Sequence, residues 1–208
     1  YALGRIFGCL RENDLFKNTW VIFTADHGEM LGDHHMSQKN LFFEGSAHVP
    51  LLIMPPQGRS LPQNISVEAP TDLVDIYPTI LAMAGLSSPV SVSGKNLLEP
   101  VPMDRMFFGN SLNKNFCVME EKVKLVYSAV GDHVLLFDLN TDPMEQHHLA
   151  EDPAWQERKA KLWKLLLEHT AQYTPEALDE NGQFLTYEAP HFPGDVPGRW
   201  FGFHYHDY

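Results

Sequence analysis

The sequence predicts an α/β protein joined to a smaller subdomain of antiparallel strands and one helix. Residues 19–24 and 50–54 are short apolar runs, a pattern typical of strands covered on both faces. Residues 73–84 carry apolar side chains at helical spacing. Four strand-like runs then fall within residues 105–140, and a helical pattern follows over residues 152–173.

The first two strands are bounded by clear local signals. A helical pattern over residues 3–16 precedes the first strand, and Pro50, Pro55 and Pro56 confine the second, because proline has no N–H to donate to a sheet. We expect both strands to be buried on both faces. The loop between them, residues 25–47, is long for a compact domain, and ordered loops of this length are usually functional.

Proline, glycine and acidic residues predict where the helices begin and end. Pro78 would break the interior of a helix, so the helix in residues 73–84 is expected to become regular near Asp75. Gly85 is expected to end it as the residue after the C-cap. In the subdomain, Asp152 is expected to cap the last helix.

The composition argues against two classes of partner. The 15 Lys and Arg residues against 27 Asp and Glu residues give a net charge of −12, and without a basic patch we expect no nucleic-acid partner. No apolar run approaches the roughly 18 to 20 residues of a membrane helix, so no membrane span is expected. The chain begins within a helical pattern and is expected to be a fragment, which leaves its compartment open between periplasmic or secreted and cytoplasmic.

Polar residues crowd the loop that follows the first strand. Residues 24–39 read "TADHGEMLGDHHMSQK", with Asp26 and His27 at the carboxyl end of the strand, where ligands sit in α/β sheets. A carboxylate oxygen and an imidazole nitrogen could both bind one divalent cation. Asp-His-Gly is also ordinary turn chemistry at the end of a strand, so the tripeptide alone leaves both interpretations open.

A longer series of motifs runs through residues 21–53, "VIFTADHGEMLGDHHMSQKNLFFEGSAHVPLLI". An apolar strand, Asp-His-Gly, Gly-Asp-His, a lysine, a Glu-Gly-Ser turn and Val-Pro-Leu follow one another. This order resembles the C-terminal half of the type I sulfatase family, within the alkaline phosphatase superfamily. The later phrases "TDLVDIYPTILAMAGL" and "LFDLNTDPMEQHHLA" resemble the family's next helix and its C-terminal hairpin, so the resemblance covers roughly residues 5–172.

The resemblance implies a fold and a division of the chain. It implies the C-terminal part of an alkaline-phosphatase-like sandwich, a mixed sheet with helices on both faces. Residues 1–100 would belong to this catalytic α/β domain, residues 101–175 to a small antiparallel sheet with its helix, and residues 176–208 to an irregular, aromatic-rich tail.

The resemblance also implies a reaction, the metal-assisted hydrolysis of a sulfate ester through a formylglycine nucleophile. Formylglycine forms from a cysteine or serine in a Cys/Ser-x-Pro-x-Arg motif, which this sequence lacks. Ser60–Asn64 comes nearest, but Asn64 stands where the motif requires arginine. The nucleophile is therefore expected in the N-terminal half of the same protein, which this chain would need as its partner.

Individual roles follow from matching each residue to the family's pattern. Asp26 matches a metal ligand and His27 the neighbouring one, which is often asparagine in calcium-dependent members. Ca²⁺ is the family's usual metal, although a nitrogen ligand at His27 fits Mn²⁺ or Zn²⁺ better. Lys39 matches the lysine that contacts the sulfate oxygens, where a cation stabilises developing negative charge.

Two nearby histidines have less specific roles. His34 is a catalytic candidate that could protonate the leaving oxygen or orient Lys39, but a hydrated loop histidine is an equal alternative. His48 is expected to pair with Glu44 and so to stabilise the loop.

Two other functions stay open. The nearer is a phosphonate monoester or phosphodiester hydrolase of the same superfamily, which resembles sulfatases in the Asp-His-Gly loop and the following lysine. The other is a non-catalytic module that keeps the fold without the chemistry. The presence of Asp26, His27 and Lys39 argues against this second alternative.

Overall fold

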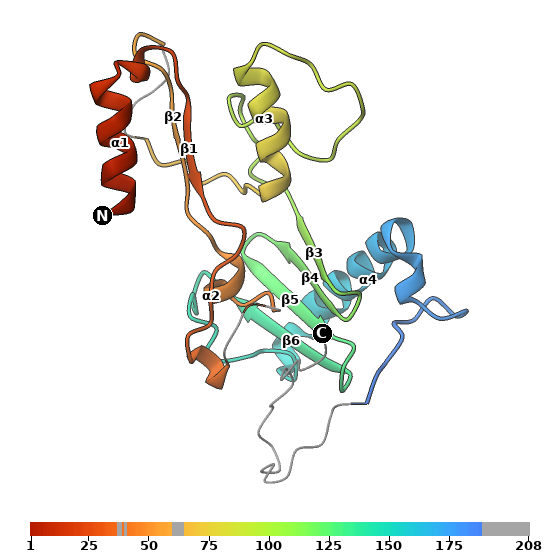
Figure 1. Ribbon diagram of the computed structural model, residues 1–208. Coiled ribbons are helices and arrows are strands. Elements are labelled where there is room, and N and C mark those ends of the chain that lie inside the picture. The colour runs from red at the N-terminus through yellow and green to blue at the C-terminus, as the bar shows by residue number, and fades with distance from the viewer. Residues whose placement is uncertain (37–38, 40, 60–64, 189–208) are drawn as a thin grey trace. The chain divides into compact units, whose positions relative to one another are not determined.

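The computed structural model describes residues 1–36, 39, 41–59 and 65–188 (Figure 1). Ser60–Asn64, the near-match to the nucleophile motif, and the end of the predicted tail lie outside the described residues. The helices and strands fall into two compact units. The N-terminal unit consists of residues 1–26 and 49–103, and the C-terminal unit of residues 27–48 and 104–208.

The boundaries of these two units do not coincide with those of the three parts expected from the sequence. The loop after the first strand, residues 27–48, groups with the small antiparallel sheet and not with the rest of residues 1–100. The loop therefore has its supporting contacts far along the chain.

The described part of the N-terminal unit contains two longer helices and a pair of strands. They are α1 (Ala2–Glu12), β1 (Val21–Thr24), β2 (Leu51–Met54) and α3 (Ile76–Met83), with short 3-10 helices at Leu15–Lys17 and Leu73–Asp75. β1 and β2 pair antiparallel, with Val21 opposite Met54 and Thr24 opposite Leu51.

The expectation that β1 and β2 are buried on both faces is wrong for the described part of the chain. Neither strand contains a fully buried residue, and the side chain of Leu52 is 60% exposed. Among the described residues each strand has one hydrogen-bonded neighbour. Burial of both faces requires a further layer on each side of the sheet, and two strands alone do not provide it.

Helix α3 begins and ends where the sequence predicts. It starts at Ile76, directly after Asp75, with Pro78 in its first turn. Gly85 follows the helix with φ +71°, the left-handed conformation that glycine adopts without steric cost. Asp75 is fully buried, and its carboxylate accepts a hydrogen bond from the Lys95 N–H at 2.7 Å, which ties α3 to the segment that follows it.

The C-terminal unit is a four-stranded antiparallel sheet with a long helix packed on one face (Figure 1). Its elements are the short helix α2 (Glu44–Ala47), the strands β3 (Phe107–Ser111), β4 (Asn115–Glu120), β5 (Val123–Ser128) and β6 (His133–Asp138), and α4 (Gln156–Tyr173). The strands lie in chain order, β3-β4-β5-β6. The Asp152 side chain accepts a hydrogen bond from the Ala154 N–H at 2.8 Å and so caps the 3-10 helix Pro153–Trp155, which leads directly into α4.

The main core lies between the sheet and α4. Phe116, Leu125 and Leu136 from the sheet and Leu162 and Leu166 from α4 are fully buried there. The alternation of the strands places these sheet residues on a single face.

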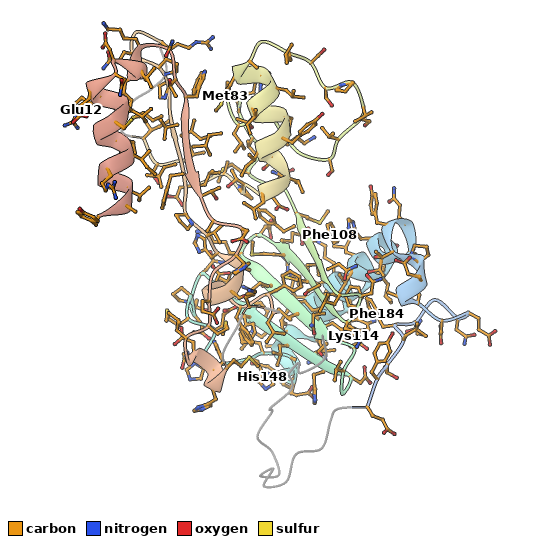
Figure 2. The ribbon with its side chains drawn as sticks, in the orientation of Figure 1. Glu12, Met83, Phe108, Lys114, His148 and Phe184 are labelled. Carbon is orange, nitrogen blue, oxygen red and sulfur yellow. The ribbon has the colours of Figure 1, made fainter. Side chains whose placement is uncertain are left out.

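The first part of the predicted tail also packs on this core. Phe184, which is labelled in Figure 2, is buried together with Ala177. The ring of Phe184 contacts the rings of Phe116 and Tyr127. The centroid of the Phe184 ring lies 4.5 Å from that of Phe116 and 4.6 Å from that of Tyr127. Aromatic contacts at such distances stabilise a core beyond the effect of buried area alone. Among the described helices, none has the length and apolar content needed to cross a membrane.

Candidate active-site loop

The second face of the sheet is covered by the loop His27–His48, which we call the site loop. Phe137 of β6 follows Leu136, which faces α4, so Phe137 points to the opposite face. There it joins apolar residues of the site loop in a second buried cluster. The cluster consists of Met30, Leu41, Phe43 and Phe137. The sheet is therefore covered by α4 on one side and by the site loop on the other.

Two glycines allow the site loop to approach other backbone and ring atoms closely. The Gly28 N–H donates to the Ser46 carbonyl at 2.7 Å, and a Cβ at position 28 would lie 2.1 Å from the Gly45 carbonyl oxygen. A Cβ at Gly109 of β3 would lie 2.4 Å from the ring of Phe42. The sequence explains Gly28 as a turn residue, and the structure adds that a side chain there would collide with backbone.

Asp26 and His27 lie just beyond the carboxyl end of β1, separated from it by Ala25, as the sequence predicts. Asp26 is the last residue grouped with the N-terminal unit, and His27 is the first grouped with the C-terminal unit. The Nδ1 atom of His27 lies 2.8 Å from the Gly28 carbonyl oxygen, so this nitrogen carries the proton and donates it. The lone pair of the ring is then on Nε2, the atom that a metal ion would meet.

The carboxylate of Asp26 and the imidazole of His27 are ligand types that divalent cations take. In the described residues no group of three or more His, Cys, Asp or Glu side chains is arranged to hold a metal ion. The donor types of Asp26 and His27 suit a divalent cation, but Ca²⁺ takes six to eight ligands. These two residues therefore fit a metal site as two of its ligands, and further donors are required.

His34 lies in the 3-10 helix Asp33–His35. Its ring stacks on Phe43 with 4.2 Å between ring centroids and an interplanar angle of 15°, so the buried cluster supports the imidazole. Leu31, His34 and His35 all have positive φ. This conformation costs a non-glycine residue about 1 to 3 kcal/mol and is often found at functional sites.

The main chain of Lys39 is anchored, and its side chain is exposed. The hydroxyl of Ser46, which is buried in α2, donates to the Lys39 carbonyl at 2.7 Å. The position of Lys39 therefore depends on α2. An exposed ammonium group is compatible with two roles, a contact with substrate oxygens or simple solvation. The catalytic role of Lys39 therefore stays a prediction.

A buried ion-pair network beneath the site loop was not predicted from the sequence. The ammonium nitrogen of Lys124, on β5, lies 2.6 Å from Glu44 Oε1 and 2.6 Å from Glu145 Oε1. The side chain of Lys124 is 3% exposed and that of Glu145 is 1% exposed. The predicted pair of His48 with Glu44 is confirmed, with 2.8 Å between Nδ1 and Oε2.

The carboxylates keep Lys124 charged in spite of its burial. Burial alone would lower the pKa of Lys124, but the neighbouring Glu145 and Glu44 outweigh it, so the pKa is raised from its ordinary value of 10.5. Cys117, beside it on the same face, is a neutral thiol, because burial raises its pKa to about 12. The sequence indicates this network only by the lysine that begins the apolar run "KLVYSAV". The run does not identify the partners of Lys124.

Comparison with known protein families and sequences finds a consistent group of relatives. Residues 1–86 match the sequence model of the family described as Sulfatase. Arylsulfatase K of Xenopus laevis is 33% identical over 168 residues, which cover 71% of this chain and 31% of that protein. The chain thus spans about a third of the length of the curated relatives that it matches.

Solved structures have the same architecture. The phosphonate monoester hydrolase of Agrobacterium radiobacter has a TM-score of 0.64 and 32% identity, covering 86% of this chain and 41% of its own. The protein of Bacteroides fragilis described as a sulfatase, yidJ, has a TM-score of 0.71 over 89% of this chain and 42% of its own, at 23% identity. The predicted α/β fold of the alkaline-phosphatase-like type is confirmed.

Proposed function

We propose that this chain, which belongs to the type I sulfatase family, is the part of a sulfuric ester hydrolase that holds the sulfate group during hydrolysis. The observation that carries the proposal is the site loop. It presents His27, His34 and Lys39 from a well-packed unit, directly after Asp26. These residues supply a pair of metal ligands, a proton donor and a cation.

Each of these residues has a defined task in the proposed reaction. Lys39 places its ammonium group against the sulfate oxygens, where a fixed positive charge stabilises the charge that develops in the transition state. His34 gives a proton to the oxygen of the leaving alcohol. Asp26 and His27 would hold a divalent cation, His27 through Nε2, and such a cation would supply additional positive charge to the site. Sulfatases generally use formylglycine as nucleophile, and here it would come from the N-terminal half of the protein.

We infer that the metal is Ca²⁺, the usual metal of the family. Mn²⁺ and Zn²⁺ are the alternatives, because His27 would supply a nitrogen ligand. Metal titration of the intact protein tests this without an activity assay. Asp26→Ala should weaken metal binding by at least about 10-fold. His27→Asn should weaken Mn²⁺ and Zn²⁺ more than Ca²⁺. Unchanged affinities in both variants would show that these residues are not ligands.

A second candidate function rests on a specific observation. The phosphonate monoester hydrolase of Agrobacterium radiobacter is 32% identical to this chain, about as similar as arylsulfatase K of Xenopus laevis at 33%. A sulfate monoester carries one negative charge and a phosphonate monoester also carries one, so charge alone does not separate the two substrates. Selectivity between them would depend on contacts made elsewhere in the protein.

The decisive experiment compares an aryl sulfate with an aryl phosphonate that has the same leaving group, using the intact protein with Ca²⁺, Mn²⁺ or Zn²⁺. We expect the sulfate to give the higher kcat/KM and chelation of the metal to abolish turnover. A higher kcat/KM for the phosphonate would establish the second candidate. Absence of turnover with both esters and all three metals would favour the non-catalytic module.

A further inference from the structure

The ion-pair network of Glu44, Lys124 and Glu145 is connected through α2 to the parts of the site loop that carry His27 and Lys39. Lys124 contacts Glu44, the first residue of α2, and the Glu44 N–H donates to Glu145 Oε2 at 2.7 Å. Within α2, the Ser46 hydroxyl donates to the Lys39 carbonyl, and the Ser46 carbonyl accepts from the Gly28 N–H. One short helix therefore joins the network to Lys39 and to the residue next to His27.

A second set of contacts between described residues of the site loop and the sheet is apolar. Met30, Leu41 and Phe43 pack on Phe137 without directional bonds. Apolar packing tolerates small shifts and repacking, whereas a lysine between two carboxylates has one arrangement in which all charges are paired. Buried ion pairs add little net stability compared with apolar groups of the same size, and their best-attested use is to fix one arrangement among several.

We propose that the Glu44–Lys124–Glu145 network is a positioning device, in which Lys124 fixes the register of the site loop on the sheet and so places Lys39 and His27 for the reaction. The proposal rests on the proposed hydrolase function for its kinetic part. Lys124 lies under the loop on β5 and acts through α2, so it is a positioning residue and not a catalytic one.

The test uses the intact protein with a single variant, a paired variant and a control variant. Lys124→Met removes the cation but leaves two carboxylates facing each other, and this variant could fail to fold for that reason alone. The paired variant Lys124→Met/Glu145→Gln avoids this, because Gln keeps an oxygen that accepts from the Glu44 N–H and Glu44 retains His48. Lys161→Met is the matched control, since Lys161 pairs with Glu120 on the surface of the same unit, at 2.6 Å.

A double-mutant cycle with Lys39→Ala separates positioning from general stability. In the protein with Lys39 present, the paired variant should lower kcat about 10- to 100-fold with a smaller change in KM, because small displacements of a catalytic group have effects of this size. In the Lys39→Ala background the same paired change should alter kcat by less than about threefold. Equal losses in both backgrounds, or no loss in a folded paired variant, would overturn the proposal.

Amide hydrogen exchange supplies a readout that does not depend on turnover. In the paired variant, exchange should become faster at Gly28, Glu44 and Ser46, while β4, β5 and α4 keep their protection. The Lys161→Met control should leave the site loop unchanged. Unchanged exchange in the site loop of the paired variant would refute the positioning role even in an active enzyme. If the wild-type protein hydrolyses neither ester, the proposed function fails, and the exchange result still decides whether the network holds the loop.

Discussion

The two units of this chain bury their apolar side chains to very different degrees. In the described part of the N-terminal unit the fully buried residues are Asp75 and Thr79, and both are polar. The C-terminal unit has two buried apolar clusters, one beneath α4 and one beneath the site loop. Both units contain strongly apolar strands, so strand hydrophobicity alone does not account for the difference.

The difference in burial between the two units follows from the number of layers that cover each sheet. β5 lies between β4 and β6, with α4 over one face and the site loop over the other, and every one of its residues is buried. In the described residues β2 pairs with β1 alone, and its residues alternate between half-buried and exposed. The site loop therefore rests on the part of the chain that has a complete core, and that core can hold catalytic groups in place.

The largest effect is expected from Lys39→Ala in the intact protein. Loss of one fixed charge at the transferred group should lower kcat by about 100- to 1,000-fold while the protein stays folded. Lys164→Ala, which removes an exposed lysine of α4 in the same unit, is the control and should leave kcat unchanged. Steady-state kinetics with an aryl sulfate measures both, and a Lys39→Ala enzyme within about twofold of wild type would exclude the assigned role.

A glycine from each unit sharpens the comparison. Gly28→Ala places a Cβ 2.1 Å from the Gly45 carbonyl, so the site loop must move, and kcat should fall by about 100-fold. Gly8→Ala in α1 meets no atom within 4 Å and should leave activity unchanged while stabilising the helix by about 1 kcal/mol. Kinetics and thermal unfolding of the two variants test this pair. Equal activities would show that the site loop tolerates the displacement.

Leucines from the two units test the difference in burial directly. In the 208-residue chain, Leu125→Ala should lower the free energy of unfolding by about 2 to 5 kcal/mol, because Leu125 is fully buried. Leu52→Ala, at a side chain that is 60% exposed, should cost less than about 1 kcal/mol. Denaturant titration measures both.

The same two leucine variants in the intact protein address the expected partner of this chain. If the N-terminal half of the protein covers β2, Leu52→Ala should there cost nearly as much as Leu125→Ala. A small effect of Leu52→Ala in both settings would mean that the exposed face of β2 stays uncovered.

The smallest effect concerns pH. His169 stacks on Phe108 with 3.9 Å between ring centroids, and burial lowers its pKa from the ordinary value of 6.5. The folded state then binds this proton more weakly than the unfolded state, so the stability is fully present above about pH 6.5 and falls as the pH drops below it. His169→Phe should flatten the pH dependence of the unfolding free energy in that range. An unchanged slope between about pH 5 and pH 7 would contradict this.

Much of the local structure could be predicted because its signals are local. The start of α3 after Asp75 and its end at Gly85 follow from backbone chemistry within a few residues, as does the Asp152 cap before α4. The order of motifs in the site loop likewise identified the family, the fold and the candidate residues. The roles of Asp26, His27, His34 and Lys39 remain predictions.

The sequence by itself predicted the longer helices, the strands, the family and a set of candidate site residues. Only the tertiary structure decided where the site loop rests and what holds it. Lys124 meets Glu44 across 80 positions of sequence, and Glu44 meets Glu145 across 101. No helical or strand period encodes contacts of that length, because they arise when the loop closes over a sheet whose strands lie much later in the chain.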